Sequence, residues 1–278
     1  MSGSTEQQIA RHYKHGDLER SILDALAAAG KDLDRLLPAD LSPVDEFHVG
    51  GRQATMDLAA QMDIKPGPHL LDIGSGLGGA SRYFADEFGC RVTGIDLTEE
   101  YVRVAEALAR RVKLDGQVSY RQASALALPF APASFDGAYM LHVGMNIEDK
   151  GLLFREARRV LRPGSVFAVY DVMRENDGPL LYPVPWATSE ETSFVERAAT
   201  YRRLLEAAGF KVQAERSRRS FAIDYFRRVR ARWAESDGPP PLGTHILMGA
   251  AAPQRIGNMT ENLQRGLVAP TEIVCRAV

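Results

Sequence analysis

The chain has 278 residues, enough for one large domain or for a domain with a cap. Its 45% hydrophobic and 25% charged residues are typical of soluble globular proteins, and a net charge of −2 creates no overall field for nucleic acid or an anionic membrane. The two cysteines argue against a disulfide framework. The N-terminal residues contain no apolar signal core, so we expect a cytoplasmic protein.

The N-terminal part of the chain is mostly helical in pattern. Leucines and an isoleucine recur at helical spacing over residues 5–37, and Pro38 is expected to break this pattern. A polar loop is expected over residues 41–52. It contains His48, which is either a packing residue or part of a loop that covers a ligand. Residues 1–62 are therefore predicted to form a helical cap and a lid loop.

Residues 69–98 are the stretch around which the chain is organised. An apolar run leads into the turn Gly74-Ser75-Gly76-Leu77-Gly78-Gly79, followed by a predicted helix and a second strand. Glycine permits the φ values that such a turn needs, and it lets a ligand approach the backbone. Asp96 ends the second strand, where a nucleotide-binding α/β fold holds ribose hydroxyls.

The glycine spacing alone leaves two cofactors open, because Gly74, Gly76 and Gly79 also match the dinucleotide pattern G-x-G-x-x-G. Asp72 favours a different ligand, since its carboxylate would repel a diphosphate and attract an ammonium group. The loop contains no Lys or Arg. A ligand with an amino-acid end and a ribose end is S-adenosylmethionine. The form D-x-G-x-G-x-G, complete here with Gly78, resembles the first motif of the class I methyltransferases.

This resemblance implies a Rossmann-like α/β fold, a doubly wound and mostly parallel seven-stranded sheet with helical caps. The core is expected over residues 63–217 and 268–278. In the resembling family, the third strand ends in an acid followed by alanine, and this pair brackets the adenine. Ser124 stands in the acid's place here, so its hydroxyl would accept a weaker hydrogen bond from the adenine amino group, while the Ala125 N–H faces an adenine nitrogen.

The exit of the fourth strand, residues 134–147, is expected beside the reacting methyl group. His142 is either a packing residue beside the donor or a general base, and His48 is the second candidate base. A base matters for a phenol or an activated ring carbon, whereas an unprotonated amine needs none. The full set of predicted donor-binding residues is Asp72, Gly74, Ser75, Gly76, Gly78, Asp96, Leu97, Ser124, Ala125, Leu141 and His142.

The acceptor is expected between the two caps. The aromatic segment 177–190 is either a packed surface loop or a wall of the acceptor pocket. Residues 218–267 are predicted to form a helical cap inserted before the last strand, with a stiff linker at 237–243. Its arginines are expected to pair with nearby acids, while a nucleic-acid face or a role in holding an acceptor carboxylate are the alternatives. The predicted acceptor contacts are Phe47, Met145, Asn146, Tyr182 and Trp186.

Residues 43–212 resemble the branch that contains the sarcosine/dimethylglycine N-methyltransferases and the ubiquinone/menaquinone/tocopherol methyltransferases. The predicted function is therefore transfer of a methyl group from S-adenosylmethionine to the N, O or activated C atom of a small, enclosed acceptor. The alternatives are an NAD-dependent oxidoreductase and a non-catalytic S-adenosylmethionine-binding protein. We expect no metal, no nucleic-acid partner, no membrane association, and a monomer or homodimer.

Overall fold

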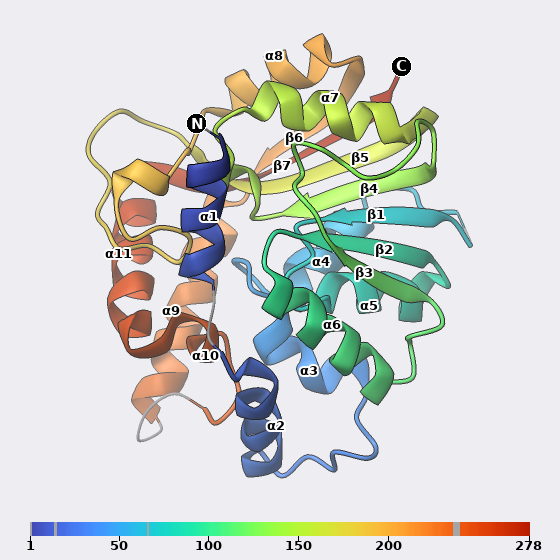
Figure 1. Cartoon of the computed structure of the whole chain (residues 1–278). Coiled ribbons are helices and arrows are strands. Elements are labelled where there is room, and N and C mark those ends of the chain that lie inside the picture. Colours follow the sequence, from blue (N-terminus) through green and yellow to red (C-terminus); the bar gives the residue numbers. More distant parts are fainter. Residues whose placement is uncertain (1, 14–15, 66, 236–239) are drawn as a thin grey trace.

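A seven-stranded sheet with the order β3-β2-β1-β4-β5-β7-β6 forms the centre of this computed structural model (Figure 1). The structure describes residues 2–13, 16–65, 67–235 and 240–278. Among them, β7 runs antiparallel to β5 and β6, and the other paired strands are parallel. The predicted mostly parallel, Rossmann-like α/β fold is thus confirmed. The strands are β1 (His69–Ile73), β2 (Arg91–Asp96), β3 (Val118–Gln122), β4 (Phe135–Leu141), β5 (Leu161–Arg174), β6 (Phe210–Ser217) and β7 (Val268–Ala277).

Helices cover both faces of the sheet, as in a doubly wound fold. The face formed with α5 (Gly79–Phe88) and α6 (Glu99–Arg111) contains Leu70 of β1. The opposite face, formed with α7 (Lys150–Val160) and α8 (Ala198–Ala207), contains Leu71 and Ile73. Successive side chains of a strand point to opposite faces, so a continuous apolar run is buried on both sides. Burying each such side chain stabilises the fold by about 1.5–3 kcal/mol.

The N-terminal cap contains α1 (Ser2–His12), α2 (Leu18–Ala28), α3 (Pro38–Asp45) and α4 (Arg52–Ala59). The prediction that Pro38 breaks the helical pattern and that residues 41–52 form a loop was wrong for the first part of that stretch, because α3 begins at Pro38. Proline is tolerated in the first turn, where its missing N–H has no intrahelical partner. Asp40 caps this turn by accepting a hydrogen bond from the Leu37 N–H at 2.9 Å.

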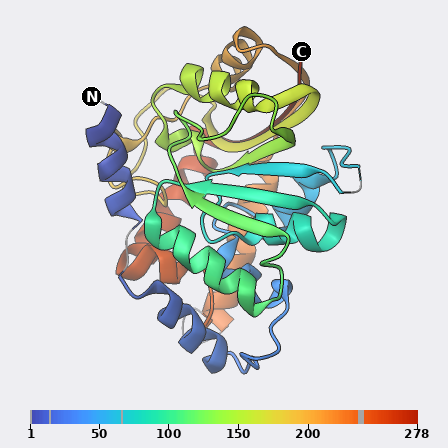
Figure 2. The same ribbon diagram turned by 45° about the vertical axis from the view of Figure 1, so that its right-hand side comes forward.

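The chain between β6 and β7 is helical. It contains α9 (Arg219–Glu235), α10 (His245–Met248), the 3-10 turn η3 (Gly249–Ala251) and α11 (Ala252–Gln264). Of the linker predicted at 237–243, residues 237–239 lie outside the described residues. Figures 1 and 2 place α1 beside this late helical segment, beyond the carboxyl ends of the parallel strands, so chain segments from both ends of the sequence border the same region.

The arginines near the late helices mainly pair with acids. Arg218 contacts Glu272 at 2.7 Å and also contacts Asp57, and Arg216 contacts Glu272 at 2.7 Å. Arg227 pairs with an acid on its own helix. These contacts agree with the expectation that the basic residues pair with neighbouring carboxylates.

Candidate active site

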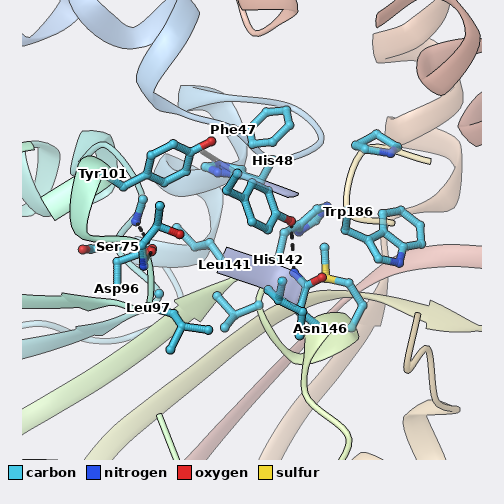
Figure 3. A pocket seen from close by; sticks show the side chains of 18 of the residues that line it. Phe47, His48, Ser75, Asp96, Leu97, Tyr101, Leu141, His142, Asn146 and Trp186 are labelled. Carbon is cyan, nitrogen blue, oxygen red and sulfur yellow. Dashed lines mark hydrogen bonds between the residues drawn. The ribbon is translucent and has the colours of Figure 1, made fainter. Parts of the chain in front are cut away.

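A cavity of about 340 Å³ lies at the carboxyl ends of the strands, under α1 and the late helices (Figure 3). Its walls come from the ends of β1, β2 and β4, from the loop at residues 45–49, from α1, and from α9, α10 and α11. In an open α/β sheet, this edge is where ligands bind. Further wall residues come from the 3-10 turn η1 (Gly144–Asn146) and from the loop that precedes the 3-10 turn η2 (Glu190–Thr192).

The Asp96 carboxylate holds the glycine-rich loop through a hydrogen bond. One carboxylate oxygen accepts a hydrogen bond from the Gly76 N–H at 2.9 Å, and the other accepts from the Thr98 N–H at 2.8 Å. Each carboxylate oxygen can accept two hydrogen bonds, so both keep capacity for a hydroxyl group in the cavity. This arrangement suits the predicted contact of Asp96 with a ribose.

The glycines of the loop differ in what surrounds them and in whether they line the cavity. All three of Gly74, Gly76 and Gly78 have positive φ, at 77°, 53° and 79°. A Cβ at Gly74 would lie 2.4 Å from a methyl carbon of Val143, whereas one at Gly76 would meet nothing within 4 Å. Gly74 and Gly76 line the cavity, but Gly78 does not, because it is the N-cap of α5 and its missing Cβ makes room for Tyr120. Gly78 thus has a packing role at the start of α5, and its contact with the donor stays a prediction.

Three buried carboxyl groups border the cavity beside the glycine-rich loop. Asp72 accepts a hydrogen bond from the Ser81 hydroxyl at 2.6 Å, and burial raises its pKa to about 7. Glu46 accepts from the Thr55 hydroxyl at 2.7 Å, and burial raises its pKa to about 8. Asp45 pairs with Arg82 at 2.5 Å. Two guanidinium groups, Arg82 and Arg52, act on this cluster of carboxyl groups. The three carboxyl groups outnumber them when all are ionised, which favours a cationic ligand at this end.

Several buried polar atoms of the wall have no hydrogen-bond partner within the described ranges. They are Asp45 Oδ1, Glu46 Oε1, Ser75 Oγ and Asn146 Oδ1, and all four residues line the cavity. Unpartnered buried polar atoms are rare and call for an explanation such as an absent ligand. The carboxylate oxygens can accept hydrogen bonds from an ammonium group and Ser75 can donate to a carboxylate, so the residues present fit the amino-acid end of the predicted donor.

His142 is held by the backbone on both sides of its ring. Nδ1 lies 3.1 Å from the carbonyl oxygen of Tyr170, and Nε2 accepts a hydrogen bond from the Val49 N–H at 3.3 Å. Burial lowers its pKa to about 3. The ring is therefore neutral with the proton on Nδ1, and its lone pair is already used. This geometry favours the packing alternative for His142 over the general-base alternative.

His48 is held on one side only. Its Nε2 lies 3.1 Å from the carbonyl oxygen of Gly51 and 3.1 Å from the Thr55 hydroxyl, so Nε2 carries the proton. Nδ1 has no hydrogen-bond partner in the described part of the chain, and the residue lines the cavity. Burial lowers the pKa of His48 to about 4, so the ring is neutral at pH 7 and Nδ1 keeps a free lone pair.

The far end of the cavity is apolar. Figure 3 shows Phe47, Trp186 and Asn146 around the space near the two histidines, as the sequence predicted for acceptor contacts, and Met145 also lines it. Tyr182 does not line the cavity; it packs half-buried against the neighbouring apolar cluster. The late helices add residues that sequence reasoning missed, namely Tyr225, Phe226, Val229, Trp233, Leu247, Met248, Ile256 and Met259.

A periodic signal for part of this wall was present in the sequence. Tyr225, Val229 and Trp233 recur every four residues, which places them on one face of α9 among the arginines. In the same way Thr5 and Ile9 recur along α1, Tyr13 follows just after its end, and all three line the cavity. The predicted donor residues Leu97, Ser124, Ala125 and Leu141 also border it.

The comparisons with known proteins agree with this architecture. Residues 71–169 match the family model described as "Methyltransferase domain". The O-methyltransferase cnsE of Penicillium expansum is 34% identical over 176 residues, covering 62% of this chain and 63% of that protein. Geranyl diphosphate C-methyltransferase from Streptomyces coelicolor A3(2), solved in complex with Mg2+, geranyl diphosphate and S-adenosyl-L-homocysteine, superposes with a TM-score of 0.72 at 18% identity over 99% of this chain and 98% of that chain. The [4+2]-cyclase SpnF superposes with a TM-score of 0.70 at 20% identity, over 98% and 96% of the two chains.

By its fold, the molecule is a Rossmann-like α/β protein with an enclosed site at the carboxyl edge of the sheet. Residues 71–169 match a methyltransferase domain, in agreement with the resemblance to the class I methyltransferases that the sequence motif carries. The chain spans between half and just under two thirds of the length of the first curated relatives that it matches. In the described residues, no helix is both long and apolar enough to cross a membrane.

Proposed function

We propose that this protein transfers a methyl group from S-adenosylmethionine to an oxygen atom of a small, largely apolar acceptor. The observation that carries the proposal is that one cavity joins an acidic, glycine-lined end to an apolar end built by the late helices. The names of relatives such as O-methyltransferase resE of Aspergillus sclerotiorum support oxygen as the atom methylated. A cytoplasmic location and a monomeric or homodimeric state are part of the same proposal.

The donor would be held by residues from both sides of the glycine-rich loop. Asp96 would accept hydrogen bonds from the ribose hydroxyls, and Ser75 would donate to the carboxylate of the amino-acid end. The carboxyl groups of Asp45, Glu46 and Asp72 would face its ammonium group. When bound, S-adenosylmethionine supplies a methyl carbon activated by the positive sulfonium. The surrounding apolar walls exclude water and orient the acceptor, and such orientation supplies much of the acceleration.

His48 is the residue that we assign to proton removal. Its Nδ1 has a free lone pair, and Nε2–H is oriented by Gly51 and Thr55. A hydroxyl acceptor becomes a better nucleophile as its proton moves to Nδ1. His142 would instead fix the loop at Val49, because its ring spans the gap between that loop and β5.

A second candidate is a catalyst that keeps the methyltransferase fold without transferring a methyl group. The observation in its favour is the likeness to a protein titled as a [4+2]-cyclase over nearly the whole chain. A third candidate, an NAD-dependent oxidoreductase, rests on the glycine spacing alone. The acidic groups around Asp72 weigh against it, since they disfavour a diphosphate.

The deciding experiment combines binding and turnover. Calorimetry with S-adenosylhomocysteine and with NAD should give micromolar binding of the first and none of the second. Incubation with methyl-labelled S-adenosylmethionine and a panel of apolar phenols, hydroxy acids and polyketide-like alcohols should then transfer label to one class. Binding of NAD alone would overturn the donor assignment. Binding of S-adenosylhomocysteine with an apolar compound that is converted without label would favour the cyclase-like alternative.

A further inference from the structure

Helix α1 contributes a carboxylate to the cavity wall on the side of β3. Glu6 lines the cavity together with Thr5 and Ile9 of the same helix. The neighbouring wall on this side consists of Leu97, from the end of β2, and the segment after β3. Because Asp96 is assigned to the ribose, this is the side on which the base of the donor would lie.

Glu6 is positioned by Ser124, although the two residues lie 118 positions apart. The Ser124 hydroxyl donates a hydrogen bond to one carboxylate oxygen of Glu6 at 2.5 Å and accepts one from the Leu126 N–H at 3.1 Å. The single proton of the hydroxyl is thus committed to Glu6. Within the described ranges, the other carboxylate oxygen of Glu6 has no hydrogen bond or ion pair.

The chemistry at this place is the complement of adenine. The six-position of adenine carries an amino group that donates hydrogen bonds, and the neighbouring ring nitrogen accepts one. A carboxylate accepts from an amino group more strongly than a hydroxyl does. The N–H of Ala125, which has no partner among the described residues, is available as a donor for the ring nitrogen.

Resting on the proposed function, we propose that Glu6 accepts the adenine amino group of the donor, and that Ser124 acts as the positioning residue that aims its carboxylate. The negative charge that resembling proteins carry at the end of the third strand would in this chain arrive from the N-terminal helix. Ser124 therefore belongs to the donor site, but it acts through Glu6. It does not itself make the contact with the adenine amino group that the sequence predicts.

This assignment couples donor binding to the docking of α1. The C-terminal end of α1 and the residue after it make two further contacts. The Asn146 side chain donates to the Tyr13 hydroxyl at 3.1 Å, and a ring nitrogen of His12 lies 3.1 Å from the carbonyl oxygen of Pro185. A ligand that bonds to Glu6 adds to these contacts. By linkage, the donor should hold α1 in place as strongly as α1 holds the donor.

The test is discrimination at the six-position of the base. Calorimetry would compare S-adenosylhomocysteine with S-inosylhomocysteine, in which an oxygen replaces the amino group. The wild type should prefer the adenine ligand by about ten- to a hundredfold, the range for a hydrogen bond to a charged group. Glu6→Gln should reduce the preference towards one, because an amide both accepts and donates. Ser124→Ala should weaken binding several-fold and keep part of the preference.

A matched control separates recognition from helix docking. Gln7→Ala changes an exposed residue of α1 beside Glu6 and should alter neither affinity nor preference. Hydrogen exchange over residues 5–12 should slow when S-adenosylhomocysteine binds the wild type, and slow less in Glu6→Gln. Equal weakening of both ligands by Glu6→Gln would mean that Glu6 only docks the helix, and this would overturn the proposal.

The role of Glu6 and the binding of the donor are tested separately by these measurements. If the wild type binds S-adenosylhomocysteine but Glu6→Gln leaves affinity and preference unchanged, the role of Glu6 is refuted and the donor assignment stands. If the wild type binds neither S-adenosylhomocysteine nor S-inosylhomocysteine, both the role of Glu6 and the donor assignment are refuted.

Discussion

His48 and His142 have ring centroids 6.0 Å apart in the wall of the cavity, and they differ in how many ring nitrogens contact the backbone. His142 uses both ring nitrogens for backbone contacts, whereas His48 uses one. The free nitrogen of His48 is therefore the only proton acceptor that this pair of rings offers to a substrate. The distinction is not visible in the sequence, where both residues lie in loops near predicted ligand sites.

Replacing the two histidines should separate catalysis from stability. His48→Ala should lower kcat for a hydroxyl acceptor by about a hundredfold or more, with the Kd for S-adenosylhomocysteine changed less than about twofold. His142→Ala should instead lower the free energy of unfolding by about 1–3 kcal/mol, because the Val49 N–H loses its partner and the Tyr170 carbonyl keeps only the hydrogen bond from the backbone N–H of residue 142. Steady-state kinetics, calorimetry and urea unfolding measure these effects. His69→Ala, at the opposite end of β1, is the histidine control for turnover. Normal turnover in His48→Ala would remove its role as a base.

Donor affinity should increase with pH. Burial raises the pKa of Asp72 to about 7 and that of Glu46 to about 8, so both carboxyl groups are mostly neutral at pH 6 and largely ionised at pH 8.5. The ionised forms attract a cationic ligand more strongly, and we expect S-adenosylmethionine binding to tighten by about tenfold over this interval. Binding near neutral pH should also release protons, which calorimetry in buffers of different ionisation enthalpy detects.

Two variants test whether Glu46 contributes to the pH dependence of donor affinity. Glu46→Gln should flatten the upper part of the profile, while Glu106→Gln, an exposed residue of α6, should leave it unchanged. A Kd that stays constant between pH 6 and 8.5 in the wild type would contradict the assignment of these carboxyl groups to the cationic end of the donor.

The glycines of the turn should differ in their tolerance of a methyl group. Gly74→Ala places a Cβ at a positive φ and 2.4 Å from Val143, so it should destabilise the fold by about 2–3 kcal/mol. Gly76→Ala carries the backbone strain without the clash and should cost about 1 kcal/mol. Urea unfolding measures both. Equal losses in the two variants would mean that the packing against Val143 adjusts without cost.

Filling the apolar end should block the acceptor and spare the donor. Val229 lines the cavity from α9, and Val229→Trp inserts a large side chain there. We expect at least a tenfold loss of kcat/KM for the acceptor, with the Kd for S-adenosylhomocysteine within about twofold of the wild type. Arg230→Trp, at the exposed neighbouring position of the same helix, is the control. A donor affinity that falls in parallel with turnover would place Val229 beside the donor instead.

Local patterns in the sequence determined the fold and the first half of the site. The run at Leu70–Ile73, the glycines at Gly74 and Gly76 and the acid at Asp96 belong to one strand-turn-helix-strand unit, whose geometry follows from short-range rules. Tertiary structure alone decided the partners that come from distant segments: Glu6 beside Ser124, Val49 against His142, and the aromatic face of α9 over the acceptor end. Helical spacing identifies which face of α1 or α9 is apolar, but the packing of the whole chain decides what that face meets. The predicted ligand class therefore rests on local patterns, whereas the proposed base, the proposed adenine contact and the proposed acceptor wall depend on long-range packing.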